Sequence, residues 1–224
     1  MQFTYYGHSC FLVESNGVKF LFDPFVNGNP LATHISVNAI TCDYIFVSHA
    51  HKPHMGDLVK IYKQNNATLI ASYEVIAWAK ECLKFHPMNY GAYTFDFGEV
   101  RMVPAVHSST FPDGSYGGLA CGFLLKLPEG NFYYSGDTGL TTDMELIPKY
   151  FAKLNFAILP IGGNFTMNVD AAIVASDFIQ CKKVIGVHYD TFDYIKIDKE
   201  LAVKKFADAG KELILLKIGE TIEL

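Results

Sequence analysis

Three histidines within six residues follow directly on an apolar segment, and this arrangement constrains the chain more than any other feature. The segment 43–48 predicts a buried strand, which runs into His49, His51 and His54. If the backbone stays extended, side chains two residues apart point to the same side, so His49 and His51 can hold one metal ion. His54 follows a turn and can reach a second position nearby. A solvated surface cluster is the alternative, but the rigid strand before the histidines favours a metal site.

Three further polar residues are expected where other predicted strands end. Each follows an apolar segment: His107 after 100–106, Asp137 after 132–135 and His188 after 183–187. Taken singly, each has an ordinary structural explanation, such as a histidine bonded to backbone or an aspartate in a turn. Polar residues at the carboxyl ends of strands tend to meet at one edge of a sheet. Together they predict additional ligands; imidazole suits zinc, and iron or manganese when carboxylates join.

The order of the predicted elements indicates one α/β domain over residues 1–224. Paired strands are expected within 2–22, with a turn at Asn16-Gly17, and again within 94–106 and 119–135. Helices are expected over 56–65, 73–84, 143–154, 169–180 and 201–209, and further strands over 68–71, 156–160, 183–187 and 213–217. No linker or low-complexity run divides the chain. We therefore expect mixed sheets inside and helices outside.

Composition narrows the range of partners. Lys and Arg number 18 against 23 Asp and Glu, and the resulting net charge of −5 argues against a dedicated nucleic-acid binder. The sequence has no signal-peptide pattern and no apolar run of about 18 residues that would predict a membrane span. Five scattered cysteines without a C-x-x-C motif fit reduced thiols. We expect a cytoplasmic protein acting on a small molecule, with no membrane or nucleic-acid partner; a homo-oligomer is left open.

Several short motifs together resemble the metallo-β-lactamase superfamily. The resemblance covers essentially the whole chain and is closest to a branch of small bacterial metal-dependent hydrolases that includes the L-ascorbate-6-phosphate lactonases. It rests on Gly7-His8-Ser9, Phe22-Asp23-Pro24-Phe25, Ser48-His49-Ala50-His51, His86-Pro87-Met88, His107-Ser108-Ser109, Gly136-Asp137-Thr138, Asn164-Phe165-Thr166-Met167 and His188-Tyr189-Asp190-Thr191. The fold it implies is an αββα sandwich, in which two mixed β-sheets are flanked by helices.

The resemblance also implies a ligand set and a reaction. It assigns His49, His51 and His107 to a first metal, His54 and His188 to a second, and Asp137 to a bridging, catalytic position between them. The implied activity is hydrolysis of a small ester, lactone or phosphoester by water activated at one or two divalent ions. Zinc is favoured, with manganese or iron as alternatives. Because Arg101 is the only arginine, a phosphorylated substrate is the least favoured of these.

Pro53 departs from the family motif, which has an aspartate directly before the third histidine. Proline offers no ligand atom, and the loss of a carboxylate leaves more positive charge uncompensated beside two cations. We therefore expect a single metal or a weak second one, and altered activity. The alternative function is a catalytically weak metal-binding domain with a sensory or scaffolding role.

Several other polar residues have roles that the sequence leaves open. His8 is expected to act as a proton donor or substrate contact, with a turn histidine bonded to backbone as the alternative. Asp57 is expected to cap a helix or orient a ligand histidine rather than bind metal itself. Asn164, Thr166 and Asp170 are expected near the pocket, although Asp170 can equally well open the helix 169–180.

Overall fold

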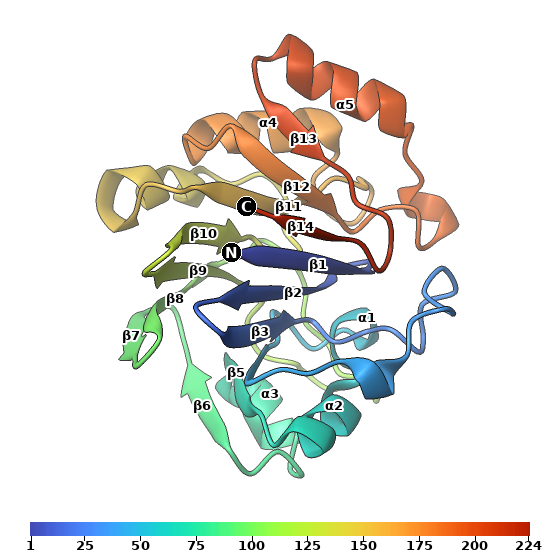
Figure 1. The fold of residues 1–224 in the computed structure, drawn as a ribbon, viewed down its shortest axis with the longest axis vertical. Coiled ribbons are helices and arrows are strands. Elements are labelled where there is room, and N and C mark those ends of the chain that lie inside the picture. The colour runs from blue at the N-terminus through green and yellow to red at the C-terminus, as the bar shows by residue number, and fades with distance from the viewer.

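The computed structural model describes residues 1–224. Two seven-stranded β-sheets lie face to face (Figure 1). In spatial order, the first sheet contains β14 (Thr221–Glu223), β1 (Gln2–Gly7), β2 (Cys10–Ser15), β3 (Val18–Phe22), β4 (Tyr44–Phe46), β5 (Thr68–Ser72) and β6 (Phe85–Met88). The second contains β13 (Glu212–Ile214), β12 (Lys183–Val187), β11 (Phe156–Pro160), β10 (Gly130–Tyr134), β9 (Cys121–Leu127), β8 (Gly98–Pro104) and β7 (Ala92–Phe95).

Helices cover the outer face of each sheet. The first sheet is covered by α2 (Leu58–Asn65) and α3 (Tyr73–Trp78), and the second by α4 (Val169–Phe178) and α5 (Lys199–Asp208). The single turn α1 (Lys52–Met55) follows β4, and short turns occur at η1 (Val37–Ala39), η2 (Thr142–Glu145), η3 (Ile147–Phe151) and η4 (Asp193–Ile195). The αββα sandwich predicted from the sequence is confirmed.

The two sheets share one pattern of strand pairing. In the first, β1, β2 and β3 are antiparallel neighbours, and β4, β5 and β6 then add in parallel to β3. In the second, β8, β9 and β10 are antiparallel, and β11, β12 and β13 add in parallel to β10. As a result β1, β3 and β4 end at one edge of their sheet, and β8, β10, β11 and β12 end at one edge of theirs. Polar residues that follow these strands can therefore meet.

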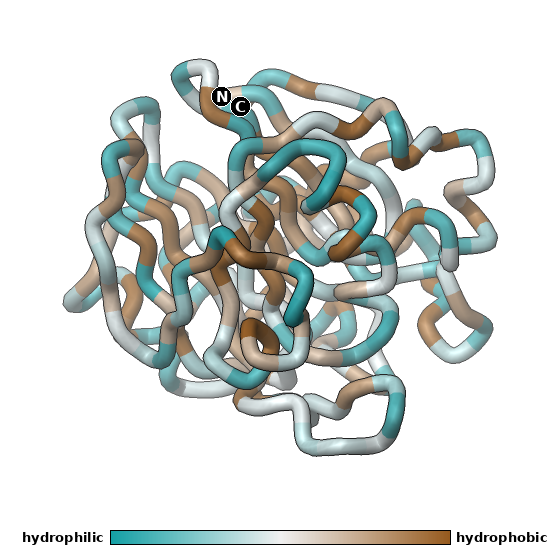
Figure 2. The backbone as a smooth tube through the Cα atoms, turned by 90° about the horizontal axis from the view of Figure 1, so that it is seen from below, coloured by the Kyte–Doolittle hydropathy of each residue, from teal (hydrophilic) through white to brown (hydrophobic).

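The two-residue period of a strand decides which core each side chain joins. On β3, Phe20 and Phe22 lie in the core between the sheets, whereas Leu21 joins the cluster under α2 and α3. Phe132 and Tyr134 on β10 enter the inter-sheet core from the other side. The rings of Phe22 and Phe132 meet edge to face, 5.9 Å apart, and burial of each such ring stabilises the fold by about 2 kcal/mol. Figure 2 shows many of the hydrophobic segments of the backbone gathered in the interior of the molecule.

The segment 143–154 is the clearest departure from the sequence prediction. The single helix predicted there was wrong: the chain forms a 3₁₀ turn, η2, followed by the π-helical turn η3. Pro148 lies in the first turn of η3, and because proline lacks an N–H and crowds the preceding turn, it interrupts a continuous α-helix.

The region after β5 also differs. The helix predicted over 73–84 ends at Trp78, because the chain must return to form β6 beside β5. Neither β6 nor β14 was predicted; β6 contains Pro87, which is tolerated because this strand lies at the sheet edge. The remaining predicted helices and strands are present, with ends shifted by a few residues.

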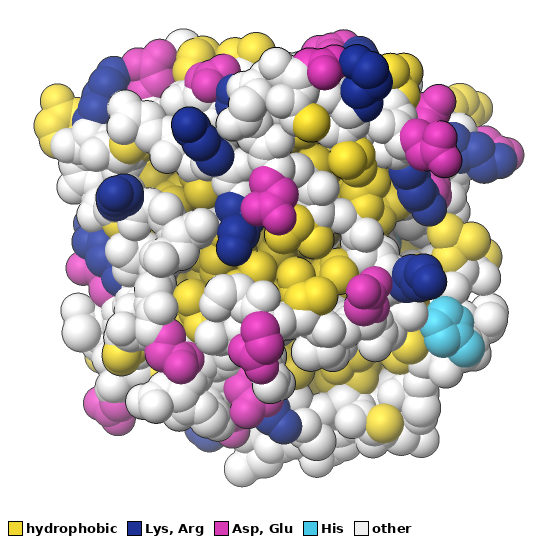
Figure 3. Space-filling model, turned by 45° about the horizontal axis from the view of Figure 1, so that its top comes forward, with side chains coloured by type: hydrophobic (Ala, Val, Ile, Leu, Met, Phe, Trp, Pro, Cys, Tyr) yellow, Lys and Arg dark blue, Asp and Glu magenta, His cyan; other side chains and the backbone are white.

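Acidic and basic side chains are interspersed on the face shown in Figure 3, and neither sign dominates it. No helix of the fold combines the length and the apolar character that crossing a bilayer requires. All five cysteines are free and buried.

Candidate metal centre

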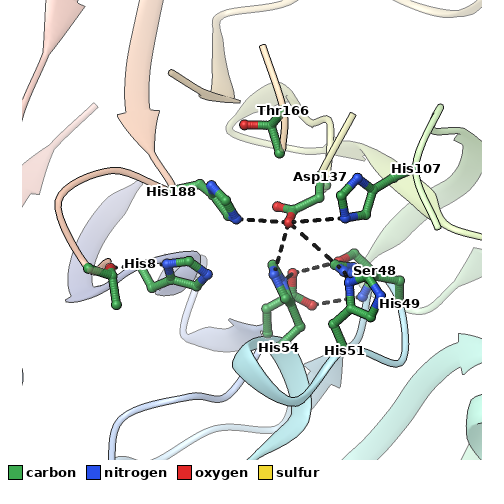
Figure 4. Close-up of polar contacts among 12 residues, drawn as sticks. His8, Ser48, His49, His51, His54, His107, Asp137, Thr166 and His188 are labelled. Atoms are coloured by element: carbon green, nitrogen blue, oxygen red, sulfur yellow. Dashed lines mark hydrogen bonds and ion pairs between the residues drawn. The ribbon is translucent and has the colours of Figure 1, made fainter. Parts of the chain in front are cut away.

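Six histidines and one aspartate converge where strands of both sheets end (Figure 4). The first sheet contributes His8 after β1 and three histidines after β4, and the second contributes His107 after β8, Asp137 after β10 and His188 after β12. The six residues predicted from the sequence as metal ligands are thus brought together, and His8 lies among them.

One group, the first triad, consists of His49, His51 and His107. Their ligand atoms lie within 4.8 Å of one another, and His49 Nε2 is 2.9 Å from His51 Nδ1. The Ser48 hydroxyl donates to a carboxylate at 2.6 Å, so it accepts from His49 Nδ1 at 3.0 Å. That bond leaves the lone pair of His49 on Nε2, the atom directed at the other ligands.

A second triad consists of His8, His54 and His188, again with ligand atoms within 4.8 Å of one another. Asp137 lies between the triads (Figure 4). Its Oδ2 is 3.1 Å from His54 Nε2 and 2.9 Å from His188 Nε2. The same oxygen is 3.9 Å from His49 Nε2 and 3.7 Å from His107 Nε2. This is the placement that a shared carboxylate ligand requires.

Asp23 is a site residue to which the sequence analysis gave no role. It is fully buried and follows β3 with a left-handed backbone angle, φ 43°. Its carboxylate accepts from the Ser48 amide at 2.7 Å, the Ser48 hydroxyl at 2.6 Å and the Tyr134 hydroxyl at 2.5 Å. It also accepts from His54 Nδ1 at 2.8 Å, which directs His54 Nε2 to the centre. A carboxylate directly after a buried strand was the signal available in the sequence.

Burial and neighbouring charges set the protonation state of the imidazoles. Burial lowers the pKa of His49, His51 and His107, so these rings stay neutral, the form that binds cations. At His54 burial acts in the same direction, but the nearby carboxylates Asp137 and Asp23 outweigh it and raise the pKa to about 10. Without a metal ion, His54 therefore carries a proton on both ring nitrogens, and the charged ring pairs with Asp137.

The residues present fit a divalent cation. Three buried polar atoms of the cluster have no hydrogen-bond partner: His8 Nε2, His188 Nδ1 and Asp137 Oδ1. An unpaired buried polar atom costs about 1–3 kcal/mol, so a cluster of this kind is stabilised by a ligand that accepts lone pairs. Imidazole nitrogen and carboxylate oxygen are donors for zinc, iron and manganese.

Neither Pro53 nor Asp57 is placed to bind metal; each has a role in the local backbone structure. Pro53 lies in the first turn of α1, where the missing N–H breaks no helical bond, and it presents no ligand atom to the site. Asp57 precedes α2, but its side chain makes no capping bond. Its carboxylate instead accepts from the amides of Val26 and Asn27 at 2.7 and 2.9 Å. The expected capping role is therefore wrong; Asp57 fixes the loop that follows β3.

An open cavity of about 390 Å³ leads to the triads, a volume suited to a small molecule. Lys52, Phe165 and Phe192 line it together with Asp137 and histidines of both triads. Thr166 lies above Asp137 (Figure 4). Asp170 does not line this cavity: it is exposed in the first turn of α4 and pairs with Lys205 at 2.7 Å, which agrees with the alternative that it opens the helix.

Comparison with known proteins agrees with this centre. A family model described as the beta-lactamase superfamily domain matches residues 2–188. A UPF0173 metal-dependent hydrolase of Flavobacterium johnsoniae is 50% identical over 226 residues, and one of Christiangramia forsetii is 47% identical over 227, each match covering 100% of both chains. The solved structure of Igni18, a metallo hydrolase from the archaeon Ignicoccus hospitalis, has a TM-score of 0.88 at 29% identity and covers 100% of this chain and 98% of that one. The chain thus belongs to the metal-dependent hydrolases of the metallo-β-lactamase superfamily, as its motifs predicted.

Proposed function

We propose that this chain hydrolyses a small carboxylic ester or lactone, with a phosphoester as the less favoured substrate. The observation that carries the proposal is the pair of histidine triads around Asp137 at the base of an open cavity. The single arginine, Arg101, lies over the ring of Phe151, away from this cavity, and so offers no guanidinium to a phosphate group.

The metal-binding residues in this proposal are His49, His51 and His107 for one ion, His54 and His188 for another, and Asp137 for both. Zinc is the proposed metal, because imidazoles dominate the ligands; manganese and iron remain alternatives. A bound divalent ion supplies Lewis acidity, which lowers the pKa of water and polarises a carbonyl oxygen.

The chain's own side chains position the reactants. Asp137 is the carboxylate placed to hold and orient a water molecule, because its Oδ1 is buried without a partner beside the cavity. Phe165 and Phe192 are each partly exposed at the mouth of the cavity, where they can contact an apolar part of the substrate. Lys52 is exposed on the same rim and can pair with a carboxylate or another anionic group.

A substrate panel tests this function. Purified protein loaded with zinc or manganese is assayed on aryl esters, lactones, thioesters and aryl phosphodiesters. We expect turnover of the esters or lactones that is abolished by chelator and by His51→Ala. His86→Ala is the matched control, because His86 lies in β6, outside the cluster. Metal binding without turnover of any of these substrates would instead support the metal-binding domain with a sensory or scaffolding role.

The setting of the activity is also a proposal. The five buried, free cysteines are compatible with a reducing compartment, and we place the protein in the cytoplasm. Residues 1–224 are proposed to act as one domain, because both sheets supply ligands to the same centre. A small molecule is the proposed partner, without nucleic acid or membrane, and a homo-oligomer is compatible with the centre.

A further inference from the structure

We infer that His8 is a metal ligand, and that it supplies at the second triad the donor that Pro53 cannot. The inference rests on the proposed metal-dependent function and extends it to a residue that the sequence analysis placed in proton transfer or substrate contact. Three observations carry it: the position of the ring, the state of its two nitrogens and the backbone that holds it.

The ring of His8 lies within the second triad. Its centre is 4.3 Å from that of His188 and 5.4 Å from that of His54, and one nitrogen from each ring can reach a common point. The side chain is almost completely buried beside the cavity, and its Nε2 has no hydrogen-bond partner. A turn histidine satisfied by backbone, the alternative considered from the sequence, would not leave a buried nitrogen unpaired.

Hydrogen bonding indicates which nitrogen of His8 can bind a cation. The hydroxyl of Thr191 lies 3.4 Å from the carbonyl of Tyr189, to which it donates, and 3.0 Å from His8 Nδ1, from which its oxygen can then accept. The lone pair of the neutral ring is then on Nε2, the unpartnered atom. Metal-binding histidines are commonly oriented in this way, with the second nitrogen donating to an oxygen.

The backbone holds His8 and His188 in one rigid arrangement. The amide of His188 donates to the carbonyl of His8 at 2.8 Å, and the hydroxyl of Tyr5 donates to the same oxygen at 3.0 Å. Both histidines have left-handed backbone angles, φ 55° for His8 and 56° for His188. Such angles are unfavourable for residues other than glycine and persist where the surrounding structure imposes them, often at functional sites.

His8 also explains how the second triad can bind a metal ion although Pro53 offers no donor atom. With Asp137 shared, the second position would offer three imidazole nitrogens and one carboxylate oxygen, four donors of the kinds that zinc binds. Replacing a carboxylate by a neutral ring changes the preference among cations. Nitrogen-rich sites favour zinc, whereas oxygen-rich sites suit manganese and magnesium. The second position is therefore expected to prefer zinc over manganese more strongly than a site that retains the motif aspartate.

Zinc titration of the full-length protein tests the assignment, with stoichiometry from mass spectrometry of bound metal and affinity from competition with a chelating dye. The unmodified protein is expected to bind two zinc ions. His8→Ala should keep the first and weaken the second by tenfold or more, while His86→Ala should change neither. Unchanged affinity for two ions in folded His8→Ala protein would overturn the assignment, as would a single zinc ion in the unmodified protein.

Two further variants keep the test meaningful if His8→Ala folds poorly. Thr191→Val removes the partner of His8 Nδ1 and should weaken only the second ion, by about 10-fold or more. Combining His8→Ala with Pro53→Asp introduces a carboxylate next to His54 and should restore a second ion; no restoration would count against the assignment. Hydrolysis is measured separately. Binding of two ions without turnover would refute the proposed function but keep His8 as a metal ligand. Turnover with only one bound ion would support the function and refute the assignment of His8.

Discussion

The two triads are assembled in different ways. The first draws His49 and His51 from one short loop after β4, and only His107 comes from the other sheet. The second draws each member from a separate place: a turn after β1, the helix α1 and a turn after β12. One short segment therefore places two members of the first triad and only His107 comes from the second sheet, whereas the second triad forms only when three separate segments are packed and two strained turns are held.

The matching topology of the two sheets explains how both triads arise. His8 after β1 occupies the position that His107 has after β8, and Asp23 after β3 corresponds to Asp137 after β10. The equivalent carboxylates have different partners: Asp137 contacts both triads, and Asp23 orients His54 from behind. The comparison indicates that substitutions will change metal binding at the second triad more easily than at the first, because the second triad depends on contacts among more separate segments of the chain.

Asp137→Asn should have the largest effect, since one carboxylate serves both triads. Breaking a buried ion pair by removal of one partner costs about 3–5 kcal/mol, equivalent to a loss of roughly 10²- to 4 × 10³-fold in affinity. We expect both metal ions to be weakened and hydrolysis to be lost, as measured by bound metal and by turnover. Asp170→Asn makes the same chemical change at an exposed ion pair and should be silent. Two tightly held ions in Asp137→Asn would contradict the shared-ligand arrangement.

His51→Ala should show whether the two triads bind metal independently. It removes a side chain of the first triad that is only half buried, so the stability of the fold should change little. We expect the first ion to be lost, turnover to be abolished as it is by chelator, and the second triad to keep some affinity for zinc. Metal stoichiometry and kcat measured on the same preparation check this. Equal loss of both ions would show that the triads are not independent.

The pairing of His49 with His51 and most of the fold were predictable from the sequence because their signals are local. An H-x-H pair after an apolar strand and alternating apolar residues on strands require no knowledge of distant contacts. Asp23 could not be assigned, because its role depends on Ser48 and Tyr134, from two other strands. His8 was placed near the pocket, but its relation to His54 and His188 appears only when β1 and β12 are brought together.

Asp23→Asn should affect the second triad more than the first. An amide has a single acceptor oxygen, so it keeps only some of the bonds from Ser48 and Tyr134 and no longer offers His54 a charged acceptor. Loss of such an outer partner lowers metal affinity by about 10- to 100-fold. Zinc titration should show that loss at the second ion and a smaller one at the first. Asp43→Asn, an exposed aspartate just before β4, is the matched control.

Pro53→Asp in the otherwise unmodified protein should have the smallest effect and the opposite sign. An aspartate in the first turn of α1 is compatible with the helix, because acidic side chains are favoured near helix N-termini. It adds an oxygen donor and a negative charge beside a position that already has His8, His54 and His188. We expect the affinity for a second manganese ion to rise by about tenfold, equivalent to 1.4 kcal/mol, and that for zinc to rise less. A manganese titration followed by electron paramagnetic resonance measures this directly. If the affinities for manganese and zinc rise equally, or neither rises, the second triad does not have the nitrogen-rich character assigned to it. The proposed chemical difference between the two triads would then be wrong.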